Sequence, residues 1–261
     1  MDNDITPILD AWDFRADKKM VRRFMGNDGL EKIQLRVDLG LLQMNIDGRP
    51  DGKRPMGHET LLDHFLTKLQ DYRNENNGED EGFRLTPEDC FKLQQEAIQF
   101  HHRYISLYQL DDFQKVLDDT DHNLELFEFV SEYAAEEELV SSMDQWRPQL
   151  LMLRARSRGM LLLKDVGAPA AIEAVEEGIN DLKEFYLEQA HPEWAESSME
   201  VQSLDNWLNE LRAGEDPPGK EDLELSEKDR IELEMQDAID REDYEKAAEC
   251  RDALAKIKQE L

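Results

Sequence analysis

The last 36 residues of the chain, Ser226–Leu261, carry apolar residues at helical spacing in two short runs, and this restricts what the segment can fold into. Ser226 is a favourable helix cap, and Asp229 follows at the position where a carboxylate completes a capping box. The next apolar residues share one helical face, and they are Ile231, Met235, Ala238 and Ile239. The run therefore predicts a short amphipathic helix.

A second helix is predicted after Asp243, which can cap it. Its apolar residues again follow a spacing of three and four, and they are Tyr244, Ala247, Ala248, Leu254, Ile257 and Leu261. The small alanine side chains allow the two helix axes to approach to the lower end of the usual range of about 8–10 Å. A hairpin of this size buries too little apolar surface to be stable alone. We therefore expect it to pack against another protein or a second copy of itself.

The pattern resembles the UVR motif, the helical hairpin found in the excision-repair proteins UvrB and UvrC, in some Clp ATPases and in McsA-type kinase activators. Part of it, Asp243–Ala248, also fits a TPR-like hairpin. The resemblance implies a protein-docking module whose partner would be a UVR-containing protein, a Clp-type or repair-type protein, or a second copy of the chain. The partner-binding residues that it implies are Met235, Ile239, Tyr244, Ala247, Ala248, Arg251, Leu254 and Ile257.

A linker is predicted before the hairpin. Arg212–Lys220 contains two glycines and the pair Pro217-Pro218 among mixed charges, which favours an extended chain. We therefore divide the chain into a small α+β unit at 1–80, a helical region at 81–211, a linker at 212–225 and the hairpin at 226–261.

Acidic side chains are concentrated beyond the N-terminal unit. Residues 1–73 contain 12 Lys+Arg and 13 Asp+Glu, whereas residues 74–261 contain 19 and 48, within a total net charge of −30. Because affinity for phosphates comes mainly from Lys and Arg, this charge distribution disfavours direct binding of nucleic acid. No apolar run approaches the ~18–20 residues that span a bilayer, and the sequence starts without a signal-peptide pattern. We expect a cytoplasmic protein of bacterial type that is not bound to a membrane.

The region at 81–211 is predicted to be mainly helical, and its acidic side chains belong to solvated helix faces. The apolar spacing predicts helices from Thr86 to Leu107, from Phe113 to Val130, from about Glu136 to Lys164 and from Ala170 to about Gln189. Residues 116–127 resemble residues 174–185, which favours a TPR-like array. An irregular helical bundle would produce the same similarity, so both architectures stay open.

Four arginines form a basic cluster within this acidic region: Arg147, Arg154, Arg156 and Arg158. The first, second and fourth share a helical face, which can clamp an acidic peptide or a phosphate. Neighbouring carboxylates are so abundant that we favour simple pairing with them instead.

The N-terminal unit contains a predicted strand pair. Glu31–Leu39 alternates apolar and polar residues, and a second alternation runs through Leu42, Met44 and Ile46. This predicts two short antiparallel strands, or one strand bent at Gly40, followed by a helix from Leu61 to Tyr72.

The loop Asp47–His58 lies between these strands and the predicted helix. It places four cationic or titratable side chains among glycines and prolines: Arg49, Lys53, Arg54 and His58. Such a loop can bring backbone amides and cations to a phosphate or an acidic side chain, although its composition favours a structural turn. If the loop serves binding, we expect replacement of its three Lys and Arg residues to shift the free energy of unfolding by less than about 0.5 kcal/mol.

No catalytic motif stands out: the chain has no P-loop, no GxSxG and no cluster of metal ligands at a known spacing. We therefore interpret the chain as a non-enzymatic adaptor without metal or cofactor, which docks partners through the hairpin and uses the helical scaffold as a second interaction surface. Two alternatives stay open. One is an accessory factor of nucleotide-excision repair that docks UvrB or UvrC, and the other is a ligand-binding or enzymatic N-terminal unit that uses the Asp47–His58 loop.

The charge distribution generates a first prediction. We expect the purified protein not to bind duplex DNA at physiological salt, because the acidic field of residues 74–261 repels phosphates. An electrophoretic mobility-shift titration at rising salt measures this. A salt-resistant shift that a fragment of residues 74–261 retains would contradict the prediction.

Overall fold

The computed structural model describes residues 4–15, 18–214 and 251. The chain divides into two units, Met1–Glu215 and Asp216–Leu261, and the described residues up to 214 belong to the first. Most of the predicted linker and all of the predicted hairpin except Arg251 therefore lie outside the described residues. The boundary expected near residue 80 stays a prediction. Within the described part, no helix combines the length and apolarity needed to cross a membrane.

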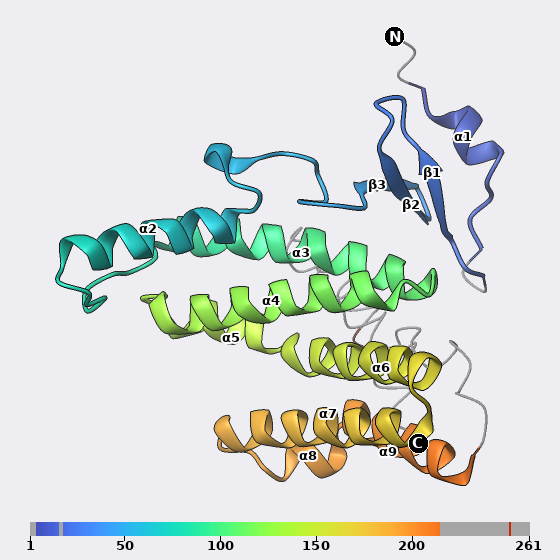
Figure 1. The fold of residues 1–261 in the computed structure, drawn as a ribbon. Coiled ribbons are helices and arrows are strands. Elements are labelled where there is room, and N and C mark those ends of the chain that lie inside the picture. Colours follow the sequence, from blue (N-terminus) through green and yellow to red (C-terminus); the bar gives the residue numbers. More distant parts are fainter. Residues whose placement is uncertain (1–3, 16–17, 215–250, 252–261) are drawn as a thin grey trace. The chain divides into compact units, whose positions relative to one another are not determined.

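Three antiparallel strands form a sheet in the order β1-β2-β3, as Figure 1 shows. They are β1 (Val21–Met25), β2 (Glu31–Val37) and β3 (Gly40–Asn45). The predicted strand pair corresponds to β2 and β3, in which Val37 pairs with Gly40 across a tight turn. Sequence analysis did not identify β1, whose register with β2 runs from Val21 opposite Leu35 to Met25 opposite Glu31.

Strand β2 is covered on both faces. Ile33 is fully buried, and Arg36 and Gln34 are buried as well, although they alternate with it along the strand. The Arg36 guanidinium donates to the backbone oxygens of Trp12, Asp38 and Gly40, each at 2.9 Å. Trp12 follows the short helix α1 (Thr6–Asp10), so the N-terminal segment contributes to a cage of carbonyl oxygens that satisfies a buried cation.

The next helices begin at reciprocal capping boxes. After the short 3₁₀ turn η1 (Pro55–Gly57), Thr60 and Asp63 form a reciprocal capping box at the start of α2 (Leu61–Glu75). Thr86 and Asp89 do the same for α3 (Pro87–Gln109). The chain then turns at Asp111, which has a positive φ of 61°, and Asp112 caps α4 (Phe113–Tyr133).

The prediction of one long helix from about Glu136 to Lys164 is wrong. This stretch forms two helices, α5 (Glu137–Asp144) and α6 (Arg147–Asp165), with Gln145 and Trp146 between them. Pro148 lies in the first turn of α6, where a missing amide proton is tolerated, whereas in a continuous helix it would remove a hydrogen bond. The proline is the sequence signal for this break.

Helix α7 (Ala168–Glu188) follows closely the prediction made from apolar spacing. Two further helices complete the unit: α8 (Trp194–Ser197) and α9 (Met199–Ala213). Sequence analysis placed residues up to 211 in the helical region but assigned no helix here. The local signals are present, since Ser198 caps α9 by accepting from the Val201 amide at 3.2 Å and Gly214 ends it with a left-handed φ of 75°.

The helices pack on one another largely in chain order, with α3 against α4, α4 against α6, α6 against α7, and α7 against α9 (Figure 1). The mainly α fold with a small N-terminal sheet is thereby confirmed. Whether the helices form a true TPR-like array or an irregular bundle is not decided by this packing order, because consecutive antiparallel helices occur in both.

Small residues bring α6 and α7 into close contact. A Cβ atom placed on Gly178 of α7 would lie 2.2 Å from the Cβ of Ala155 on α6, which is closer than two carbon atoms can approach. Gly159 of α6 is equally constrained, since a Cβ there would lie 2.6 Å from the Trp207 ring. The close packing of α6 against α7 and of α6 against α9 therefore depends on these two glycines.

We expect Gly178→Ala to destabilise the protein by about 1–3 kcal/mol, because overpacking outweighs the ~0.5–1 kcal/mol that alanine gains over glycine inside a helix. Urea unfolding followed by circular dichroism measures the change. Gly40→Ala is the matched control, since nothing lies within 4 Å of the added methyl group. Equal stability of the two variants would mean that α6 and α7 can separate without cost.

Candidate functional site

The first cation of the Asp47–His58 loop points into the protein. The Nε atom of Arg49 lies 3.3 Å from a carboxylate oxygen of Glu96 on α3 and 3.4 Å from Asp51 in its own loop. Its side chain is only 13% exposed. Arg49 therefore serves the interior of the fold and is not presented to a ligand.

Glu96 is a buried carboxylate that holds the start of α2. It is fully inaccessible to solvent and accepts from the backbone amides of Leu61, at 2.7 and 2.9 Å, and Leu62, at 3.0 Å. A negative charge at this point also interacts favourably with the positive end of the helix dipole. His122 of α4 approaches to 3.6 Å and stacks on Phe100. One acidic side chain of α3 thus links α2, α4 and the loop.

Arg103 connects the start of the same loop to the helices. Its guanidinium donates to the backbone oxygens of Asn45, at 3.0 Å, and Gly48, at 2.6 Å. The remaining nitrogens form a two-point ion pair with Asp119 of α4, at 2.8 and 2.6 Å, in which both side chains are almost completely buried. Burial raises the pKa of the Asp119 carboxyl, and the Arg103 guanidinium acts in the opposite direction.

The four predicted ligand residues of the loop have separate environments. Arg54 is exposed and pairs with Glu59 at 3.2 Å, and Lys53 is exposed as well. The His58 ring lies edge-on to His64, with 5.2 Å between the ring centroids. Because Arg49 is directed to Glu96, the structure does not gather these groups around one anion site. Among the described residues, no three His, Cys, Asp or Glu side chains are grouped to hold a metal ion.

Three arginines of the α6 cluster are paired with carboxylates, as favoured from the sequence. Arg147 bonds Asp144 at 3.0 Å, and Arg158 bonds Glu177 at 2.5 Å. Arg156 is buried and donates to Ser203 of α9. Arg154 differs from the other arginines because it connects two helices, α4 and α7, through carboxylates on each.

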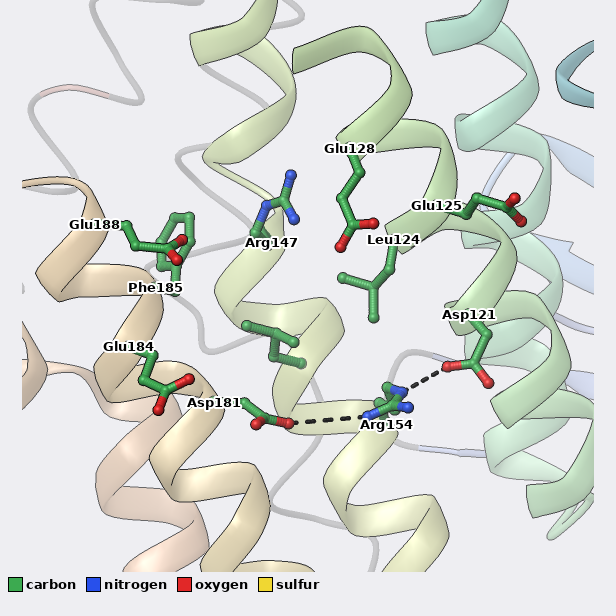
Figure 2. Close-up of a pocket in the computed structure, with 11 residues that line it drawn as sticks. Asp121, Leu124, Glu125, Glu128, Arg147, Arg154, Asp181, Glu184, Phe185 and Glu188 are labelled. Carbon is green, nitrogen blue, oxygen red and sulfur yellow. Dashed lines mark hydrogen bonds and ion pairs between the residues drawn. The ribbon is translucent and has the colours of Figure 1, made fainter. Parts of the chain in front are cut away.

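A groove lies over α6, between α4 and α7, and has a volume of about 390 Å³ (Figure 2). Its apolar lining residues are Leu124, Leu151 and Phe185. Six carboxylates line it, three from each flanking helix: Asp121, Glu125, Glu128, Asp181, Glu184 and Glu188. Against them stand two guanidinium groups, those of Arg147 and Arg154. The groove is therefore an acidic surface with apolar side chains at its base.

Sequence analysis did not identify this groove. It assigned the acidic residues of this region to solvated helix faces, because helical spacing shows which residues share a face but not which helices lie side by side. The available signal was the recurrence of acids three and four residues apart on two predicted helices: at 121, 125 and 128, and again at 181, 184 and 188.

The predicted partner-binding residues of the hairpin lie outside the described residues, with the exception of Arg251, which is helical and exposed. Their assignment stays a prediction. Comparison with known families supports the segment itself: residues 226–260 match the family described as the UvrB/uvrC motif. The chain therefore carries a UVR motif in this segment. No curated protein and no solved structure matches the chain.

The environment of Glu96 generates a prediction about stability. We expect Glu96→Ala to cost about 3–5 kcal/mol, because it leaves two buried amides without their acceptor and removes one of the two carboxylates beside Arg49. Glu96→Gln retains an oxygen that can accept from one amide, and we expect a smaller loss of about 1–2 kcal/mol. Both are measured by urea unfolding.

Glu59→Ala is the matched control, since Glu59 is an exposed carboxylate whose one ion pair is at the surface. We expect it to change the free energy of unfolding by less than about 0.5 kcal/mol. If Glu96→Ala were no more destabilising than Glu59→Ala, the capping role of Glu96 would be wrong.

Proposed function

We propose that this chain is a non-enzymatic cytoplasmic adaptor that docks partner proteins through its UVR segment. The observation that carries the proposal is the match of residues 226–260 to the UvrB/uvrC motif, a motif of protein–protein and repair-related interactions. The physical argument is independent of the family. A hairpin of about 35 residues has too small an interior to bury its apolar faces, so these faces are available to a second protein.

The unit at 1–215 supports the proposal as a scaffold that carries the docking segment. Its buried charged side chains include Glu96, Arg103 and Asp119. These three bond to backbone groups or to each other, so they stabilise the fold. The enzymatic alternative relied on the Asp47–His58 loop, and one of the loop's cations, Arg49, is directed to Glu96 instead of to a ligand. The helical surface, including the groove over α6, is the second interaction surface of the proposed adaptor.

A role in nucleotide-excision repair is the second candidate, favoured by the same motif match. In that case the partner is UvrB or UvrC, and the chain acts through protein contact and not through DNA, since residues 74–261 carry 48 acidic against 19 basic side chains. Affinity purification from the native cell, with the full chain and with a chain that ends at residue 219, separates the candidates. Recovery of the repair nuclease with the full chain alone favours the repair role.

The hairpin generates a prediction of its own. We expect Leu254→Asp and Ile257→Asp each to abolish partner binding while the unit at 1–215 stays folded, because both place a charge on a face that is apolar in a partner contact. Ala248→Arg should disrupt the hairpin itself, at about 2–5 kcal/mol, through overpacking and burial of a charge. Pulldown measures the contact and circular dichroism the fold.

Gln236→Asp serves as the matched control, since it adds the same charge at a polar position of the hairpin. We expect this variant to bind partners at the wild-type level. Wild-type binding by both Leu254→Asp and Ile257→Asp would mean that the hairpin packs against its own chain or has no partner, and the adaptor proposal would lose its main support.

A further inference from the structure

We propose that the groove over α6 is a docking site for a basic peptide segment of a partner protein, one in which lysines or arginines flank an apolar side chain. The inference rests on the proposed function in one respect: it identifies the second interaction surface of the adaptor and the chemistry of what binds there. The site is formed by α4, α6 and α7, entirely within the described residues, and none of the residues that line it belongs to the UVR segment.

The base of the groove suits an apolar side chain. Leu124 of α4 and Leu151 of α6 are half-buried, and Phe185 of α7 is 9% exposed. Figure 2 shows these helices around the groove, with carboxylates on either side. A volume of about 390 Å³ lies within the range of sites that enclose a small ligand or a few side chains. Burial of an apolar side chain here would add a contribution that salt does not screen.

The walls of the groove carry negative charge that the protein does not neutralise. Glu125 and Glu128 on α4, and Glu184 and Glu188 on α7, are exposed, and no ion pair is found for any of them in the described part of the chain. The two guanidinium groups of the groove already have carboxylate partners, since Arg147 bonds Asp144 and Arg154 bonds Asp121. Four carboxylates thus face one groove without a countercharge, which favours a cationic occupant.

Arg154 shows how this groove holds a cation. Its guanidinium lies 2.5 Å from Asp121 on α4 and 3.9 Å from Asp181 on α7, so one arginine connects the two walls (Figure 2). The unpaired glutamates continue the same two rows, three to seven residues further along each helix. An arginine or lysine of the partner can therefore pair with these glutamates as Arg154 pairs with Asp121 and Asp181 within the chain.

The spacing of the carboxylates fits a peptide better than a small cation. From residue 121 to residue 128 the acidic row of α4 extends about 10 Å, at ~1.5 Å per residue, which matches cations spaced three or four residues apart on a helix. A single metal ion would need its ligands gathered at one point, and the described residues contain no group of three that could do this. A nucleic acid is repelled by the same charges.

The test is fluorescence anisotropy with the full chain and a labelled peptide of about 12 residues built from lysine, arginine and leucine, long enough to span the acidic row. We expect binding that weakens at least ~10-fold as salt rises from about 50 to about 300 mM, as for contacts between exposed charges. The same peptide with glutamine in place of each lysine and arginine should not bind.

The decisive variant removes the charge of the four unpaired glutamates that line the groove. It combines Glu125→Gln, Glu128→Gln, Glu184→Gln and Glu188→Gln. We expect it to bind the basic peptide at least ~10-fold more weakly than the wild type and to retain its fold, because all four side chains are exposed. The matched control removes the same charge from exposed acids outside the groove: Asp71→Asn, Glu75→Gln, Asp165→Asn and Glu173→Gln. It should bind within ~2-fold of the wild type.

Three results would overturn the proposal. The first is no binding of the basic peptide by the wild type. The second is an equal loss of peptide affinity in the groove variant and in the control, which would mean that only the overall charge matters. The third is tighter binding of spermine than of the peptide, which would make the occupant a small polycation. The outcome is separate from that of the UVR proposal. Leu254→Asp changes none of the residues that line the groove, so we expect it to abolish pulldown of the UVR partner without altering the peptide affinity.

Discussion

The buried ion pair between Arg103 and Asp119 is the interaction on which the arrangement of the N-terminal unit depends. Arg103 reaches from α3 to the carbonyl oxygens of Asn45 and Gly48, and Asp119 of α4 holds it in that orientation. Removing one partner of such a pair leaves a charge buried without compensation, which is far more costly than never having buried it. Glu96 lies about two helical turns before Arg103 on the same helix, and it fixes α2 and Arg49 in a comparable way. Through these two side chains, α3 organises the sheet, the loop and α2.

The carboxylates of the interior differ from those of the groove in whether they have a partner. In the interior, the buried carboxylates of Glu96 and Asp119 have amide and guanidinium partners, as electrostatics in a poorly solvated environment requires. Over α6, carboxylates remain unpaired in solvent, where their repulsion is tolerable and their field extends outward. The acidic composition of the chain therefore has at least two roles, one that stabilises the fold and one that we assign to partner recognition.

Two interaction elements of different chemistry follow for the proposed adaptor. The UVR segment is predicted to offer apolar helical faces, whose contacts are insensitive to salt, and the groove offers a charged surface, whose contacts weaken as salt rises. Two weak contacts in one chain can produce a high combined affinity when a partner engages both, because the second binding event becomes intramolecular. Such an adaptor would release partners that bind only the UVR segment or only the groove.

The sequence by itself determined the local structure: the capping boxes at Thr60 and Thr86, the hairpin of β2 and β3, the main helices and the UVR motif all rest on residues close together in the chain. Apolar spacing predicted one helix from 136 to 164, although Pro148 starts a new helix there, and it did not identify β1 or α9. Only the tertiary structure decided that Arg49 points to Glu96 and that the acids of α4 and α7 face one groove. Those pairings join residues tens of positions apart, and helical periodicity contains no information about which helices become neighbours.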